Sequence, residues 1–480
     1  MARKAPGWRW LALAMLGIAA LPLYARILAV AGQLATSADL FTLPELGALA
    51  VAVIAAALVL LSRPAGTRGR RWIELALLLG FGAAFRAIFF TATPAISHDA
   101  YRYVWDAHLL ANGVSPWVHA LSDPALKPLR DSAIWPLVNW RSSPTIYPPG
   151  AQLVFLLVNA VAPLNIAAMK WAMTLCDFGI GALTLVLLRQ RGQDLRRVVI
   201  YWWNPLPIVE FTFNAHVDAL ATLWTLAALA MLARDTRRAR GVSGVLLGLA
   251  ATTKLYPLLF AVALLRPNSS ITAPLTSTAT VGASGGRPPA TVGAWHTTLA
   301  PAHHYRALLA TLRRQVTDPL LLALGATVVL VYLPFAFIGL GNGGFLATYF
   351  GQRFPDQGIL FHLLTSLFVV APLQLALQGL ALVALCGLVA WLRLARGLEP
   401  EAGVLAVSAI WIVLSPHLFP WYVAGLLPLL ALYLQPIPLL HLSRFLHVGA
   451  SPFLRVGALP AVPAKGRGEN LVPLSSQERG

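Results

Sequence analysis

A dense run of polar and aromatic side chains, Ser97 to Asp106, interrupts an otherwise apolar chain. Its first carboxylate, Asp99, could take a proton from the hydroxyl of a sugar or lipid at a membrane surface. The rings of the run could stack on a sugar, and its arginine could hold phosphate; the residues concerned are Tyr101, Arg102, Tyr103, Trp105 and Asp106. The alternative is a structural helix start, with Asp99 as its cap and the rings in an interfacial belt.

Three other polar segments, far apart in the sequence, are candidates for the same site. We expect substrate contacts from Tyr147, in Thr145-Ile146-Tyr147-Pro148-Pro149-Gly150, and from Asn214, His216 and Asp218. His417, between Pro416 and Pro420, could assist proton transfer as a second catalytic residue or bind phosphate. Polar segments that meet at one membrane depth are typical of an active site. The alternatives are a solvated turn capped by Asp218 and an ordinary interfacial histidine.

Three cations inside or beside apolar stretches could hold the phosphate of a lipid: Arg86, Lys170 and Lys254. Arg86 and Lys170 fall near the outer ends of predicted helices, from which they could instead snorkel to the interface. Asp177 lies deeper than Lys170 on the same predicted helix, and a buried acid needs a partner. Lys254 is a candidate partner, in a pair that would be structural as readily as functional.

The elements that must position these residues are membrane helices. Of the 480 residues, 58% are hydrophobic and only 11% are charged, and the mean hydropathy is +0.70. Soluble domains carry about 25% charged residues, so a soluble fold is excluded. The net charge of +18 gathers in short clusters between apolar stretches, as the positive-inside rule requires, and does not indicate nucleic-acid binding. Two cysteines, Cys176 and Cys386, lie in apolar stretches and predict neither a disulfide framework nor a metal site.

The hydropathy pattern predicts an all-α polytopic membrane protein with about 10–12 transmembrane helices and a large first exterior loop. A short apolar stretch, 150–163, is expected to be re-entrant or interfacial, and 242–265 forms either one span or two half-depth helices. The predicted spans are 10–31, 46–62, 72–92, 165–188, 198–213, 217–233, 318–340, 373–392, 402–416 and 422–435.

The basic clusters orient these spans. Arg3, Lys4 and Arg9 place the N-terminus inside, and a second cluster, from Arg63 to Arg71, follows the second span. The Asp99 segment then falls outside. Residues 267–303 are predicted to be a low-complexity cytoplasmic insert within a transmembrane domain of residues 1–435, and residues 436–480 a basic, disordered tail.

The chain has no P-loop, no dinucleotide-binding glycine signature and no zinc-type spacing of histidines and cysteines. This argues against an ATP-driven transporter and against a transferase that uses a cytosolic nucleotide sugar through its own soluble domain. No cofactor is required by the sequence, and a divalent metal ion stays open.

Several of these motifs resemble the bacterial GT-C membrane glycosyltransferases. The similarity is greatest to glycosyltransferase family 87 and to the mannosyltransferases that use polyprenol-phosphate-mannose. It covers residues 75 to 435 and rests on His98 to Asp106, Asn112 to Trp117, Thr145 to Gln152, Asn204-Pro205-Leu206 with Glu210, Asn214 to Asp218, and Gly248 to Pro257.

The resemblance implies a hexosyltransferase of a bacterial-type cell membrane that builds cell-envelope glycans, with its active site on the exterior face. A sugar, expected to be mannose, would move from a polyprenyl phosphate to a lipid or glycan hydroxyl with inversion. Asp99 would be the general base, and Tyr101, Arg102, Tyr147, His216 and His417 would shape the pocket. The alternatives are a multi-span transporter or lipid flippase without transferase activity, and an inactive scaffold protein.

Overall fold

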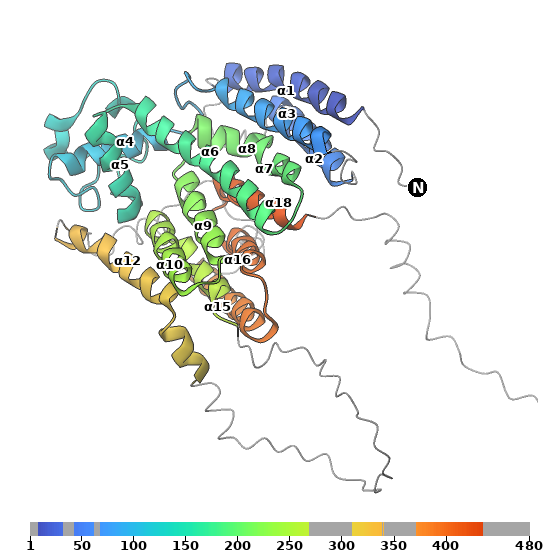
Figure 1. Ribbon diagram of the computed structural model, residues 1–480. Coiled ribbons are helices and arrows are strands. Elements are labelled where there is room, and N and C mark those ends of the chain that lie inside the picture. The colour runs from blue at the N-terminus through green and yellow to red at the C-terminus, as the bar shows by residue number, and fades with distance from the viewer. Residues whose placement is uncertain are drawn as a thin grey trace, which may run out of the picture. The chain divides into compact units, whose positions relative to one another are not determined.

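The computed structural model describes residues 8–31, 43–61, 68–267, 310–337, 339 and 371–434, all within one compact unit that ends at Leu434. The regular elements of these residues are helices, with no strand among them (Figure 1). The predicted all-α class is therefore confirmed. The predicted insert (apart from residue 267) and the predicted tail lie outside the described residues, and the division into domains stays a prediction.

In the described part of the chain, five helices are long and apolar enough to cross a membrane: α1 (Arg9–Ala31), α2 (Leu43–Leu60), α6 (Ile166–Gln190), α12 (Pro319–Ala336) and α15 (Ala371–Arg396). In α12 and α15 only 17% of the most apolar window is buried, which leaves wide apolar faces for lipid. The chain is thus an integral membrane protein of polytopic class, as predicted. The total of ten to twelve helices stays a prediction.

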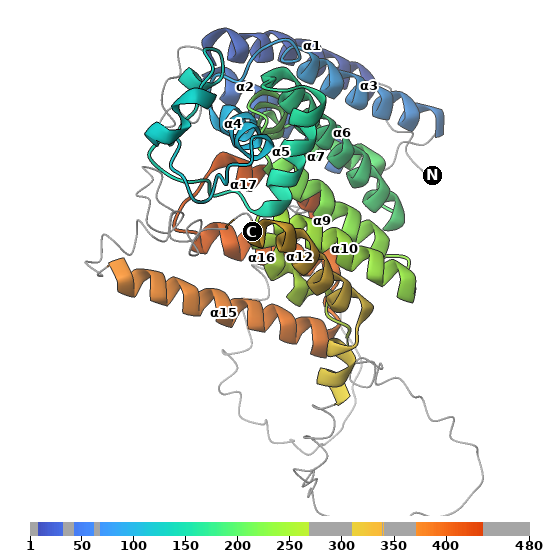
Figure 2. The same ribbon diagram turned by 90° about the vertical axis from the view of Figure 1, so that its left-hand side faces the viewer.

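Near the N-terminus, α1 packs against α2 and against α3 (Arg68–Ala87), and Figures 1 and 2 show these helices side by side. α3 begins and ends about four residues before the predicted span 72–92. Helix α10 (Arg237–Thr253) lies between α9 (Asp218–Leu232) and α12. A Cβ atom at Gly244 of α10 would lie 2.1 Å from the carbonyl oxygen of Leu320 in α12. The small residue therefore allows the two backbones to touch, as in other tightly packed membrane helices.

The predicted span 198–213 is wrong as a single helix. It is broken into α7 (Val199–Trp202), α8 (Pro205–Pro207) and a π-helix (Ile208–Phe213), and its last part, Pro205–Phe213, meets α9 at an angle of 114°. Two prolines explain the break between α7 and α8, because proline has no N–H group to donate and clashes with the preceding turn. The bend leaves residues 214–217 in a turn between two apolar elements.

Of the two alternatives for 242–265, the structure favours two elements. Helix α10 ends at Thr253, Lys254 is extended with φ −139°, and a 3-10 helix runs from Tyr256 to Leu264. The second short stretch, 150–163, is the 13-residue helix α5 (Pro149–Val161), which at about 1.5 Å per residue is too short to cross a bilayer. A Cβ atom at Gly150 would lie 2.7 Å from the backbone of Thr252, so α5 begins directly against the end of α10.

The other short helices complete the unit. α16 (Pro400–Leu414) packs against α15 and the 3-10 helix, and α17 (Pro420–Ala424) and α18 (Leu427–Tyr433) follow it. Before α5, the polar segment of residues 97–148 folds into α4 (Asp99–Ala111) and two 3-10 turns, Pro124–Leu129 and Trp135–Leu137.

Candidate active site

The starts of α4, α5, α9 and α17 and the end of α10 bring polar side chains together. α4 packs against α5, α5 against α10, and α17 against the π-helix (Figure 2). α4 and α9 begin at an aspartate, α5 and α17 begin at a proline, and α10 ends at a threonine. The site is therefore built at breaks in helices rather than along them.

Asp99 is the first residue of α4, and its N-terminal neighbour His98 is the cap. Its Oδ1 accepts a hydrogen bond from the Asn139 side chain at 2.6 Å, and its Oδ2 accepts one from the Tyr147 hydroxyl at 3.1 Å. The side chain is 16% exposed, whereas most of its neighbours are buried. Asp99 is therefore a partly exposed carboxylate that two hydrogen bonds hold in place.

His216 lies between two carboxylates. Its Nδ1 is 3.6 Å from Asp99 Oδ2 and its Nε2 is 3.2 Å from Glu210 Oε2. The ring stacks on Trp421, with ring centroids 3.8 Å apart and planes at 21°. Because the side chain is only 1% exposed, the imidazole has little freedom to leave this position.

The backbone around His216 is locally strained. The π-helix ends at Phe213, and Ala215, two residues further on, has φ +60°. The His216 N–H donates to the Glu210 carbonyl at 2.9 Å. A left-handed alanine costs about 1–2 kcal/mol, and glycine is the usual residue at such a helix end. π-helical turns and strained residues both gather at functional sites, where surrounding structure holds them.

Asp218 and Lys254 form an ion pair beside this group, with Nζ 3.1 Å from Oδ2. Asp218 is 1% exposed but the lysine side chain is 16% exposed. The ammonium group also lies 5.7 Å from the centroid of the Tyr147 ring and 5.6 Å from that of Tyr422. Lys254 thus places a cation between two aromatic rings, one of which belongs to Tyr147, the residue that donates a hydrogen bond to Asp99.

Tyr103 and Tyr147 line the buried side of the site. Burial, together with the negative charge of Asp99, raises the pKa of both hydroxyls well above the usual value. They therefore stay neutral donors at ordinary pH. The Tyr103 ring stacks on Phe155 at 4.4 Å and meets Tyr147 edge-on, so this aromatic group holds the start of α5 against α4.

Asn214 accepts a hydrogen bond from the Ser97 N–H at 3.3 Å, which ties the turn before α9 to the start of α4. Two of the other predicted substrate contacts, Arg102 and Asp106, bind each other at 2.8 Å. Arg102 also donates to the carbonyls of Trp140 and Ser143. Both are buried, as is Tyr101, whose hydroxyl donates to the Pro94 carbonyl. They hold the polar segment together, and contact with substrate stays a prediction for them.

Two predicted phosphate ligands lie elsewhere. Arg86 is fully buried and bound to Asp177, so the predicted partnership of Asp177 with Lys254 is wrong. The reason is geometric: Arg86 at the end of α3 reaches Asp177 of α6, whereas Lys254 lies at the end of α10, beside Asp218. Lys170 donates to the carbonyls of Phe89, Phe90 and Ala92, which satisfies groups just past the end of α3.

His417 is 7% exposed, and the Ser415 hydroxyl donates to its carbonyl at 2.6 Å. Its ring lies 6.3 Å from that of Phe419, which stacks on Trp421 at 4.5 Å. The rings of Phe419 and Trp421 thus lie between the predicted catalytic histidine and His216.

Comparison with known families identifies the chain. The family model described as alpha-(1->6)-mannopyranosyltransferase, N-terminal domain, matches residues 6–266, more than half of the sequence. The chain belongs to this mannosyltransferase family. No curated protein matches it, and no solved structure matches it. The matched region carries Asp99, Tyr147, His216, Asp218 and Lys254. The expectation of a glycosyltransferase that acts on mannose is thereby confirmed.

Three residues that contact Asp99 or His216 in this mannosyltransferase had no role predicted from the sequence: Asn139, Glu210 and Trp421. Glu210 belonged to a motif of the family resemblance but had no assigned role. The sequence did contain a clue to it: Glu210 is an acidic residue in an apolar segment broken by prolines. Burying an acidic side chain there costs free energy unless it has a partner. Asn139 lies 40 residues from Asp99 in irregular chain, and no sequence pattern predicts that contact.

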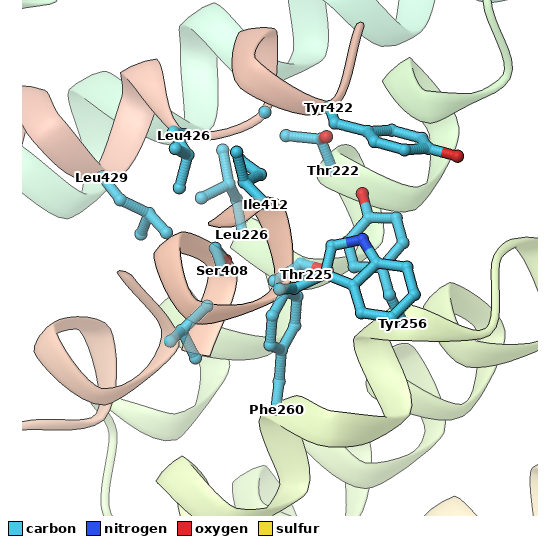
Figure 3. Close-up of a pocket in the computed structure, with 13 residues that line it drawn as sticks. Thr222, Thr225, Leu226, Tyr256, Phe260, Ser408, Ile412, Tyr422, Leu426 and Leu429 are labelled. Carbon is cyan, nitrogen blue, oxygen red and sulfur yellow. The ribbon is translucent and has the colours of Figure 1, made fainter. Parts of the chain in front are cut away.

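In the part of the mannosyltransferase that the structure describes, no group of three or more His, Cys, Asp or Glu is arranged to hold a metal ion. A small pocket with mostly apolar walls lies beside the site, between α9, the 3-10 helix and α16 to α18, and its cavity volume is about 20 Å³, room for about one water molecule. Figure 3 shows Tyr422 and Tyr256 at one end of this cavity and Leu426 and Leu429 at the other.

Proposed function

We propose that this mannosyltransferase moves mannose from a polyprenyl phosphate to a hydroxyl of a lipid or glycan, with inversion and with Asp99 as the general base. The observation that carries the proposal is the state of Asp99, a partly exposed carboxylate held by Asn139 and Tyr147. A positioned base of this kind contributes about 10²–10⁴-fold to a proton-transfer step.

The proposed reaction is a single displacement. Asp99 takes the proton of the acceptor hydroxyl as that oxygen bonds to the anomeric carbon. The bond from that carbon to the phosphate oxygen breaks, and polyprenyl phosphate leaves with the bonding electrons. The family name specifies an alpha-(1->6) product. With inversion, an α-linked product requires a β-linked mannosyl phosphate donor.

Lys254 is the proposed ligand of the donor phosphate. Its partly exposed side chain would bring an ammonium group to neutralise the charge that develops on the leaving group. Tyr422 both flanks Lys254 and lines the adjacent cavity, so a phosphate at the lysine would have an apolar surface next to it. This arrangement suits a donor with a charged head and a hydrocarbon chain. Arg102 and Asp106 are proposed to position the polar segment, and His417 to support Trp421.

We propose that the site faces the exterior. Helix α9 starts at the site with Asp218 and ends just before Arg234. Helix α10 starts at Arg237 and returns to the site at Lys254. The basic cluster therefore lies about 23–26 Å from the site, at the other ends of two helices of 15 and 17 residues. Basic clusters stay on the cytoplasmic side, which supports an exterior active site in a bacterial-type membrane.

The test is transfer by the purified full chain in lipid nanodiscs, with a short-chain polyprenyl β-mannosyl phosphate as donor and an alkyl α-mannoside as acceptor. We expect an α-linked product, and a loss of about 10²–10⁴-fold for Asp99→Asn with unchanged yield and thermal stability. Asp131→Asn in the same polar segment is the matched control, because Asp131 caps a turn and lies outside the site.

Full activity of the Asp99→Asn variant would contradict the assignment of the base. Movement of labelled donor lipid across vesicles without any glycosylated product would favour a flippase or transporter instead. A failure to bind donor at all would favour a scaffold protein.

A further inference from the structure

Neither ring nitrogen of His216 makes a hydrogen bond, although the ring is buried. Both of its ring nitrogens face carboxylates, at 3.6 Å and 3.2 Å, and neither contact has the alignment of a hydrogen bond. Catalytic contacts are often long in the absence of substrate and tighten when it binds. The histidine is thus held beside the proposed base by stacking on Trp421 and by burial.

The carboxylate on one ring nitrogen determines where the proton of a neutral imidazole resides. Glu210 is the nearer carboxylate and faces Nε2, so it favours a proton on that atom. Nδ1 then carries a lone pair and faces Asp99. When Asp99 is protonated by the acceptor hydroxyl, its O–H group therefore lies next to a basic nitrogen.

We propose that His216 is a second proton carrier of this site, which takes from Asp99 the proton that Asp99 removes from the acceptor. This proposal rests on the proposed function above. The O–H bond of the Asp99 carboxylic acid breaks, an N–H bond forms at Nδ1, and Asp99 becomes a carboxylate again. The resulting imidazolium lies between two negative charges, which stabilise it. After product leaves, the proton returns to water through Asp99, which is partly exposed.

The remaining groups near the ring do not supply another base. Tyr103 and Tyr147 are neutral hydroxyls, and Asn214 is a neutral amide. Asp218 is held by the Lys254 ammonium. On the α17 side the contact is the indole ring of Trp421. Asp99 and Glu210 are therefore the charged groups that directly face the imidazole among the described residues.

The first experiment measures kcat and KM between about pH 5 and pH 9, the range in which histidine changes charge. We expect His216→Gln to lower kcat by about 10- to 100-fold with KM little changed, and to alter the acid limb of the pH profile. Glu210→Gln, which keeps the shape and loses the charge, should alter the same limb by less. His119→Gln is the control, since His119 pairs with Asp123 and is 40% exposed.

The second experiment separates proton transfer from packing. In His216→Ala, added imidazole should restore transfer, and substituted imidazoles should do so in order of their basicity. Pyrazole, a ring of the same size and much weaker basicity, should not. Equal rescue by pyrazole and imidazole, or a wild-type pH profile for both His216→Gln and Glu210→Gln, would overturn the proposal.

The outcomes distinguish this inference from the proposed function. If Asp99→Asn retains wild-type transfer, the assignment of Asp99 as the base is wrong, and so is the proposed proton transfer to His216. If Asp99→Asn is inactive while His216→Gln keeps the wild-type rate and pH profile, Asp99 is the base and only the proton transfer to His216 is wrong.

Discussion

Two buried ion pairs in this protein have opposite surroundings. Arg86 and Asp177 are both fully buried, and the carboxylate accepts from Arg86, Tyr201 and Thr212. Asp218 and Lys254 are joined by one contact at 3.1 Å that lacks hydrogen-bond alignment, and the lysine is partly exposed. In the first pair, both charged groups have their hydrogen-bonding partners within the protein. In the second pair, the charged groups can still accept or donate hydrogen bonds to a ligand.

The difference teaches how polar groups in a membrane protein divide between structure and chemistry. A complete network such as that of Arg86 fixes α3 against α6 and Trp202, whose ring lies 3.8 Å beneath the guanidinium. The group around Asp99, His216 and Lys254 is incomplete, and incomplete polar groups in the membrane are costly unless they are used. Incomplete pairing therefore locates the proposed active site better than charge alone.

The largest effect on stability is expected at the complete pair. Asp177→Ala leaves Arg86 buried and uncompensated, which costs about 3–5 kcal/mol of unfolding free energy. Arg86→Met with Asp177→Leu removes both charges and should recover much of that loss. Thermal unfolding in nanodiscs measures both, and transfer by the folded double variant should be close to wild type. If Asp177→Ala were as stable as wild type, the Arg86–Asp177 pair would not be the structural counterpart of the Asp218–Lys254 pair.

The same design applied to the second pair should give a different outcome. Lys254→Gln with Asp218→Asn leaves no buried charge, so we expect stability within about 1 kcal/mol of wild type. Transfer should nevertheless fall by roughly 10- to 100-fold, since a cation at the leaving phosphate is lost. Lys254→Arg keeps the charge and serves as the control. Recovery of transfer in the neutral double variant would show that this pair, too, is structural.

The smallest effect concerns the strained turn that carries His216. Ala215→Gly relieves the left-handed backbone but loses a buried methyl group, so unfolding free energy should change by less than about 1 kcal/mol. Ala215→Val, β-branched at φ +60°, should cost about 2–3 kcal/mol. Thermal unfolding measures both changes. A tolerated valine would mean that the turn is not held in this conformation.

Local patterns predicted much of what the structure describes. The apolar runs of α1, α2, α6, α12 and α15 have the length and composition that a bilayer requires, and these helices are within a few residues of the predicted spans. Span 198–213 was wrong because hydropathy does not register where prolines break a helix. The contact of Lys254 with Asp218 rather than Asp177 depends on which helices face each other, and no local pattern records that.

By itself, the sequence determined the membrane class, the mannosyltransferase resemblance and the candidacy of Asp99, because these follow from composition and from short, contiguous motifs. Only the tertiary structure decided which polar residues meet. Arg86 and Lys170 bind other groups of the protein, a carboxylate and backbone carbonyls respectively. Asn139, Glu210 and Trp421 instead contact Asp99 or His216. The physical reason is that pairing between buried polar groups depends on how helix ends pack against one another, and that packing is a property of the whole chain.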